Sequence, residues 1–337
     1  MKTTAIAPLL LILISGLQAQ VLPPNEEGTI YADYFNVTRA NKPVQYISTG
    51  PFRDNGSGQW LVFEGLIAPQ YVIYRGRDAN DGWRQRGIIT FVPSIQLRMF
   101  NEESFPVRPP NFNPYFELLY LLHWNEENGR KAFTYFEGQL AHLSNGQTGS
   151  FFNPDSTINL ENGNFSTNYY QLGITRSQYL GGSLPGLLNG ALASATFFYR
   201  NDWQIGGSPF TIEEGLRGRY GLQRFSVITQ LRTRNLNWGT YSYNGQQPKK
   251  QFSYLLRLTQ TYQLGGITEL DGKNRRYSLE AFLGVYPANW RMFGLMARFY
   301  HGRDYYNIRF DRKISLFQFG FLVDFDKFKP SNYRVVE

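Results

Sequence analysis

A histidine and a serine stand two positions apart in the segment Ala141-His142-Leu143-Ser144-Asn145-Gly146, which ends a run of alternating polar and apolar residues. On an extended strand, residues i and i+2 lie side by side on one face. A histidine base beside a serine hydroxyl is the minimal arrangement for an activated nucleophile. The pair therefore predicts ester hydrolysis by a serine.

The strand that carries the pair is expected over 132–143 and has one polar and one apolar face. In a membrane barrel the polar face lines the lumen and the apolar face meets lipid. Glu137 and Gln139 belong to the polar face. The opposite face carries Phe136, Gly138, Leu140, His142 and Ser144. We therefore expect His142 and Ser144 to point outward, toward lipid.

The next expected strand, 168–177, brings an asparagine to the same place. Asn168 shares the outward face of this strand with Leu172 and Ile174, and consecutive strands joined by a loop are antiparallel neighbours. The connecting loop is long, and long loops of such barrels are extracellular. Polar groups that face hydrocarbon are costly and are therefore functional candidates. The alternative is that His142 is only an interfacial residue and Ser144 only a turn residue.

The N-terminus and the composition indicate an exported membrane barrel. Lys2, the apolar stretch 5–15 and the small-residue site Leu17-Gln18-Ala19 predict a signal peptide over 1–19. No later run of about 18 apolar residues predicts a spanning helix. Aromatic residues make up 17% of the chain, while its mean hydropathy is −0.39. A polar lumen, an apolar outer band and aromatic girdles would give this mixture.

The absence of cysteine and the net charge indicate how the protein is stabilised and which partners it contacts. Without disulfides, an exported chain would depend on a closed, hydrogen-bonded barrel. The net charge of +8 favours contact with anionic lipid headgroups, although a simple contribution to solubility explains it equally well. Export argues against a nucleic-acid partner.

Turn signals and alternating segments predict the strands. Eight Asn-Gly or Asp-Gly pairs favour tight turns. In the last segment Phe317, Phe319 and Phe321 alternate with Gln318 and Gly320. Strands are expected near 59–67, 86–100, 115–124, 132–143, 168–177, 191–201, 223–234, 250–262, 276–286, 290–301 and 314–326, with one more in 27–49 or 70–76.

The predicted fold is an all-β transmembrane antiparallel β-barrel of about 12 strands, since single-chain bacterial barrels have even strand numbers. The barrel is expected over 59–326, after an N-terminal segment at 20–58 and before a polar tail at 327–337. A soluble β-sandwich is the alternative fold.

At these residues the chain resembles the outer-membrane phospholipase A family. That family carries a His-x-Ser-Asn-Gly motif on a barrel strand and a catalytic asparagine at the start of the next strand. Here the motif stands at 142–146 and the asparagine at Asn168. An upstream stretch, 101–114, resembles the family's segment between two early strands. The clear similarity covers 86–177.

The resemblance implies a bacterial outer-membrane enzyme that hydrolyses acyl esters of glycerophospholipids. It implies dependence on Ca²⁺ and activation by reversible homodimerisation. Ser144 would be the nucleophile, His142 the base, and Asn168 the residue that holds the imidazole tautomer. The amide of Gly146 would be an oxyanion donor.

For calcium, the resemblance points to the backbone carbonyls of Ser104 and Gln147. The loop after the motif is longer than in the family, so the remaining ligand is left open among Ser150, Asp155, Ser156 and Ser166.

Two other functions stay open. A lipid A deacylase also uses a His-x-Ser pair, on a smaller barrel with an acidic third member. A porin-like barrel would have no catalysis at all. His123 and His301 are interpreted as interfacial residues, and 78–82 as an exposed loop. Inward arginines such as Arg257 are expected to pair with lumen acids such as Glu280.

Overall fold

The computed structural model describes residues 27–76, 86–104, 106–127, 130–180, 191–203, 216, 218–233, 236–237, 251–264, 267, 276–287, 290 and 293–323. The expected signal peptide at 1–19, the tail at 327–337 and the loop at 78–82 lie outside these residues.

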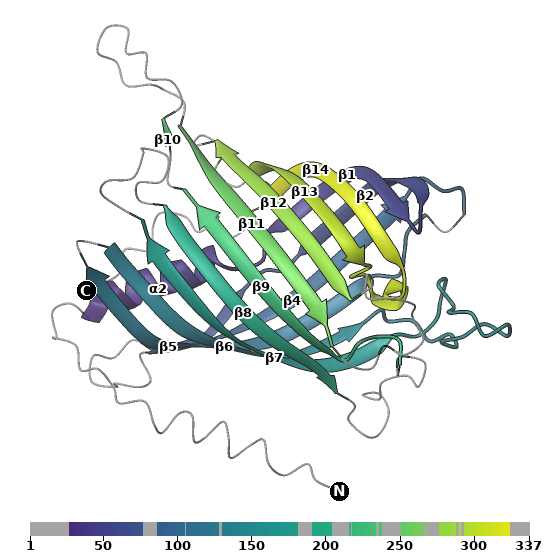
Figure 1. Cartoon of the computed structure of the whole chain (residues 1–337), viewed down its shortest axis with the longest axis horizontal. Helices are drawn as coiled ribbons and strands as arrows, with labels where there is room; N and C mark the ends of the chain where they lie inside the picture. The colour runs from purple at the N-terminus through teal and green to yellow at the C-terminus, as the bar shows by residue number, and fades with distance from the viewer. Residues whose placement is uncertain are drawn as a thin grey trace, which may run out of the picture.

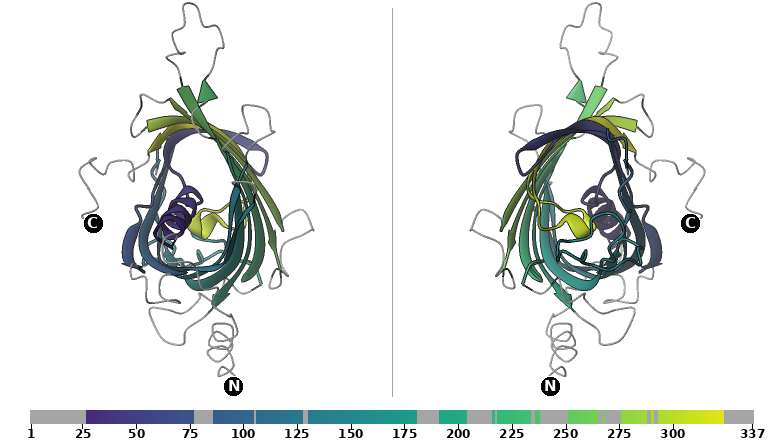
Figure 2. Two further views of the ribbon diagram at one scale, coloured as in Figure 1. Left: turned by 90° about the vertical axis from the view of Figure 1, so that its left-hand side faces the viewer. Right: turned by 90° about the vertical axis from the view of Figure 1, so that its right-hand side faces the viewer.

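Within the described residues, twelve strands pair antiparallel around a closed ring, which confirms the predicted transmembrane β-barrel (Figures 1 and 2). The first and last strands close it, with Gln45 opposite Val323. A short β3 (Tyr71–Arg75) pairs with β4, and β10 (Leu236–Asn237) extends the edge of β11. The ring runs β1 (Gln45–Asp54), β2 (Ser57–Ile67), β4 (Gly87–Phe100), β5 (Asn111–Glu127), β6 (Arg130–Ser144), β7 (Ser166–Tyr179), β8 (Leu192–Trp203), β9 (Gln223–Arg232), β11 (Gln251–Gln263), β12 (Tyr277–Pro287), β13 (Phe293–Arg303) and β14 (Lys313–Val323).

The barrel begins earlier than expected, at Gln45 rather than at position 59. Buried residues alternate with more exposed ones throughout β1, including at Gly50 and Pro51, but its register to β2 shifts between Ser48 and Gly50. Glycine is needed at this shift, because a Cβ on Gly50 would lie 2.0 Å from the Phe317 carbonyl oxygen. The further strand expected in 27–49 or 70–76 corresponds in part to β1, whose second half, with a proline beside a glycine, resembles a turn in sequence.

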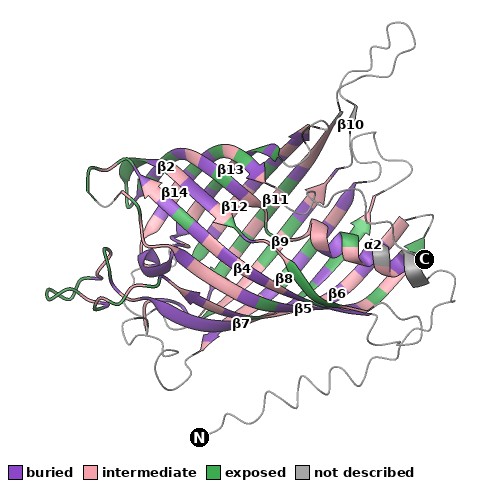
Figure 3. Ribbon diagram, turned by 180° about the vertical axis from the view of Figure 1, so that it is seen from behind, coloured by how far each residue is buried: buried purple, intermediate pink, exposed green. Residues whose placement is uncertain are grey.

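Along the strands, exposed apolar side chains alternate with buried ones, as Figure 3 shows. On β14, Phe317, Phe319 and Phe321 are exposed, while Gln318 between them is fully buried. The polar face therefore lines the lumen and the aromatic face points outward, as predicted. No helix in the described part of the chain is long and apolar enough to cross a membrane.

A helix, α2 (Glu27–Ala40), lies inside one end of the barrel (Figure 2). Ile30, Tyr34 and Val37 recur at the spacing of one helical face and are buried against inward residues that include Phe133 and Tyr135. Burial of each such side chain contributes about 1.5–3 kcal/mol. The sequence analysis considered only a strand for this region, so the helix is a correction.

Lumen side chains hold the carbonyls at the end of α2. Gln230 and Arg232 donate to the Ala40 carbonyl, and Arg257 donates to those of Asn41 and Lys42. Cations at a helix C-terminus are favourable because the carbonyls there carry partial negative charge. Arg257 therefore binds the carbonyls at the end of α2 and does not pair with Glu280 as expected. Glu280 instead forms an ion pair with Arg298 at 2.5 Å.

We call the end of the barrel where β6 ends and β7 begins the site end. Segments of three loops pack across the lumen there, around Phe165, Tyr220 and Phe310. The short 3-10 helix η4 (Asn307–Arg309) belongs to one of them and is visible inside the ring in Figure 2. Below it, Arg98 bridges Glu64 and Asp304 at 2.9 Å each, with all three groups buried. The lumen is therefore occupied by protein at both ends.

Candidate active site on the outer face

The register of β6 and β7 places His142 directly opposite Asn168. Their side chains meet, with His142 Nδ1 at 3.0 Å from Asn168 Oδ1. An amide oxygen can only accept, so this bond requires the tautomer with hydrogen on Nδ1. The other ring nitrogen, Nε2, is then the one with a lone pair and can take a proton.

His142 and Ser144 lie on the outer face, as expected from the alternation. They share the parity of Leu140, which is 60% exposed, whereas Ala141 and Leu143 between them are buried in the lumen. Both residues are half-buried. At about 3.3 Å per residue, positions i and i+2 are ~6.6 Å apart along a strand. An imidazole held at its Nδ1 can direct Nε2 along the strand across such a gap.

Asn145 fixes the chain immediately after the serine. This asparagine is fully buried, and its Nδ2 donates to the Gly163 carbonyl at 2.8 Å. Its Oδ1 accepts from the backbone amides of Phe165 at 3.0 Å and Gln147 at 3.2 Å. One side chain therefore ties both ends of the loop that joins β6 to β7.

Gly146 forms the turn that follows. Its φ is +67°, and a Cβ there would lie 3.2 Å from the Phe112 ring. The left-handed conformation and the close ring both favour glycine. Gly146 is exposed, and among the described residues no hydrogen bond uses its amide. The amide is thus available to a ligand outside the barrel.

Two aromatic residues lie next to Asn168 in the sheet, and the sequence analysis did not assign them to the site. Trp203 on β8 lies directly opposite Asn168, and its ring centroid is 5.7 Å from that of Tyr170. Asn168 is left only 6% exposed. Water is largely excluded from the side of the imidazole held by Asn168. Trp203 was missed because the predicted strand ended at position 201.

The structure places the two predicted calcium ligands in different loops. Ser104 is exposed in the β4–β5 loop and Gln147 is half-buried in the β6–β7 loop, both at the site end. In the described part of the chain, no three His, Cys, Asp or Glu side chains gather as a metal site. Calcium also accepts carbonyl and hydroxyl oxygens, so a site built on the carbonyls of Ser104 and Gln147 needs no such cluster.

Two of the candidates for the remaining ligand can be distinguished. Asp155 is fully exposed, and hydrogen bonds from the Thr157 hydroxyl and amide hold the pKa of its carboxyl below the usual range. Ser166 instead lies opposite Ser144 in the β6–β7 register. Ser166 is therefore the candidate that the fold brings beside Ser144.

Comparisons with known proteins reveal barrels of this kind. No protein-family model and no curated protein matches the chain. Outer membrane phospholipase A from Escherichia coli is 13% identical over 83% of this chain and 92% of that one, with a TM-score of 0.49. The Salmonella typhi outer membrane phospholipase, solved as a dimer with bound calcium, is 13% identical over 86% and 96% of the two chains, with the same TM-score. Assignment of activity therefore rests on this chain's own geometry.

Proposed function

We propose that this protein is an outer-membrane phospholipase of the A type, which hydrolyses acyl esters of glycerophospholipids. The observation that carries the proposal is the 3.0 Å contact between His142 Nδ1 and Asn168 Oδ1 on the outer face, with Ser144 two positions along the strand from His142 on the same face. A hydrogen-bonded His–Asn pair beside a serine on a surface that meets lipid needs a function, because exposed polar groups are costly there.

In the proposed reaction, Ser144 Oγ attacks the ester carbonyl carbon while His142 Nε2 takes the hydroxyl proton. The carbonyl oxygen becomes negative and accepts a hydrogen bond from the Gly146 amide. The tetrahedral intermediate then expels the alcohol of the lysophospholipid, which receives the proton from His142. Water repeats the sequence on the acyl-serine and releases the fatty acid.

Asn168 holds the imidazole in the required tautomer and orientation, the role that an aspartate plays in other triads. A neutral amide suits this position. Asn168 is only 6% exposed, and an unpaired carboxylate at such a buried position would be expensive.

The level of the site supports a membrane-lipid substrate. His142 and Ser144 end the outward apolar stripe of β6 and adjoin the loops of the site end. We infer that this end lies at the outer leaflet of a bacterial outer membrane, where lipid ester groups would reach the serine. The protein-filled lumen favours this function over that of a conducting porin.

Calcium dependence and reversible homodimerisation belong to the proposal through the family resemblance. The backbone carbonyls of Ser104 and Gln147 would hold the ion, which would supply Lewis-acid stabilisation of the developing negative charge.

The first test is fatty-acid release by the purified protein in detergent, with calcium or with a chelator. Ser144→Ala and His142→Ala should each lower kcat by at least about 10³-fold, because either change removes the activated nucleophile. His123→Ala, an exposed histidine on β5, is the matched control and should keep full activity. Hydrolysis by Ser144→Ala at the parent's rate would refute the mechanism. Release from lipopolysaccharide but not from phospholipid would favour the deacylase.

A further inference from the structure

A second histidine–serine pair lies on the outer wall of the barrel. His301 on β13 is directly opposite Ser315 on β14, and His301 Nδ1 lies 2.7 Å from Ser315 Oγ. Both residues share the outward parity of Phe299 and Phe317, which are exposed. Two polar side chains therefore interrupt an apolar, lipid-facing surface at this point as well.

This pair sits on the opposite side of the ring from the candidate active site. Six steps of strand pairing separate β6 from β13 in either direction. His142 and His301 each stand two residues before the end of their strand, and both strands end at the site end. The two polar clusters are therefore at matching levels on opposite walls.

Two cations adjoin the second pair. Arg53 on β1 is exposed and directly opposite Ser315, on the side of β14 away from His301. Lys313 precedes Ser315 by two positions on β14 and therefore shares its outward parity. Among the described residues neither cation has an ion-pair partner, since the neighbouring Asp54 is paired with Arg312. The cluster thus offers positive charge without a counter-ion.

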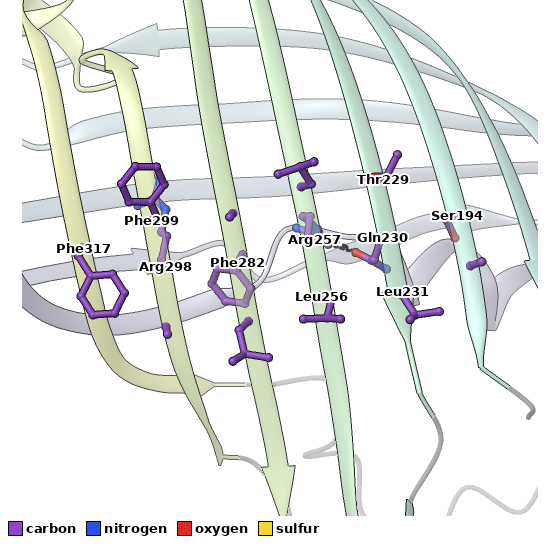
Figure 4. A pocket seen from close by; sticks show the side chains of 15 residues that line it. Ser194, Thr229, Gln230, Leu231, Leu256, Arg257, Phe282, Arg298, Phe299 and Phe317 are labelled. Atoms are coloured by element: carbon purple, nitrogen blue, oxygen red, sulfur yellow. Dashed lines mark hydrogen bonds between the residues drawn. The ribbon is translucent and has the colours of Figure 1, made fainter. Parts of the chain in front are cut away.

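An apolar groove begins immediately beside this cluster. It has a volume of about 580 Å³ and is lined mostly by outward apolar residues of β8, β9 and β11 to β14, among them Leu256, Leu258 and Leu283 (Figure 4). The inward residues between them also border it, namely Ser194, Gln230, Arg257, Phe282 and Arg298. Phe299 and Phe317, the next outward residues after His301 and Ser315, form one side of it. Ala281 and Ala297 line the groove between larger residues, and their small side chains leave space for a ligand. A polar, cationic head and an apolar channel are therefore continuous on one surface.

We propose that this surface binds an anionic glycerophospholipid, with its phosphate on the cluster Arg53–His301–Ser315–Lys313 and an acyl chain in the groove. A guanidinium matches phosphate oxygens with two parallel hydrogen bonds, and an ammonium and a serine hydroxyl add further donors. Cationic side chains at the membrane surface also attract anionic lipids.

The cluster is a binding site rather than a second active site. Asn168 fixes the tautomer of His142, but among the described residues Ser315 is the one hydrogen-bond partner of the His301 side chain. The ring therefore lacks a third group to orient it, and Arg53 stands where an anion would be held. The inference uses the membrane location but not the ester hydrolysis.

The test measures lipid binding to the full-length Ser144→Ala protein in detergent by native mass spectrometry, so that hydrolysis cannot consume the ligand. Phosphatidylglycerol should bind in preference to phosphatidylcholine. Arg53→Gln combined with Lys313→Gln should weaken phosphatidylglycerol binding at least about tenfold, as expected for the loss of charge-assisted hydrogen bonds. Arg176→Gln, an exposed outward cation at the opposite end of β7, should change nothing.

A second variant tests the groove. Ala297→Phe should weaken binding of phosphatidylglycerol, whereas Ile174→Phe on the outward face of β7 should not. Equal binding of the two lipids, or unchanged binding by the double variant, would overturn the proposal. If inorganic phosphate competes with the lipid and Ala297→Phe has no effect, the site binds a free anion and not a phospholipid. Because binding is read without catalysis, an inactive parent protein would not affect the outcome.

Discussion

At the scale of single residues, the site depends on how one imidazole is held. Asn168 accepts from His142 Nδ1 and is itself buried, so the ring has one tautomer and one orientation. In the proposed reaction, Ser144 depends on that orientation, since its proton must reach Nε2 across the spacing of two strand residues. The geometry therefore assigns Asn168 a positioning role with a kinetic signature of its own.

Asn168→Ala should lower kcat about tenfold or more and leave KM nearly unchanged, because a hydrogen bond of about 1–1.5 kcal/mol orients the base without touching the substrate. The measurement is a Michaelis–Menten series in mixed micelles. Asn168→Gln is the conservative variant. A higher kcat for Asn168→Gln than for Asn168→Ala would support orientation by an amide. An effect on KM alone would contradict the positioning role.

At the scale of elements, the strand pair β6–β7 is completed by the loop that Asn145 ties at both ends. The three hydrogen bonds of this buried side chain hold Gln147, Gly163 and Phe165. The same clamp sets the turn at Gly146, whose amide is the proposed oxyanion donor. Loop order and catalysis are therefore coupled through one residue that touches no substrate.

Asn145→Ala should loosen loop 145–165 and lower activity while the barrel stays folded. Each backbone group left unpaired by the loss costs about 1–3 kcal/mol. Hydrogen exchange should rise within the loop and not in β6 or β7. Asn153→Ala removes a single exposed contact with Thr157 and serves as the control. Unchanged exchange in the loop would show that the clamp is dispensable.

At the scale of the whole molecule, the barrel is filled as well as closed. α2 occupies one end, loop segments occupy the other, and charged side chains join the walls between them. Arg98 is fully buried between Glu64 and Asp304, and Arg298 reaches Glu64 from the other side at 3.0 Å. These pairs connect β2, β4 and β13 to the loop before β14.

Arg98→Met should destabilise the barrel by about 3–5 kcal/mol, because it leaves the buried Asp304 carboxylate without its ion-pair partner and removes one of the two that Glu64 has. Thermal or urea unfolding in detergent, followed by circular dichroism, measures this loss. Arg176→Met on the outer face should stay within about 0.5 kcal/mol of the parent. Similar stabilities of the two variants would mean that water already reaches Glu64.

The sequence predicted what depends on local alternation. Phe317, Phe319 and Phe321 face outward as expected, and the parity of β6 and β7 was sufficient to bring His142 and Asn168 together. α2 could not be predicted in this way, because its apolar face meets the inside of a barrel that the local pattern does not reveal. The cluster at Ser315 was also invisible, since Arg53 lies far from it in sequence and reaches it only through ring closure.

The pairing of β1 with β14 joins the two extremities of the chain. Arg53 comes from the first strand to leave the ribosome and Ser315 from the last, so the surface they share is absent until assembly is complete. A phospholipid held there would touch both partners of the final pairing and favour the shut cylinder over one that is still open.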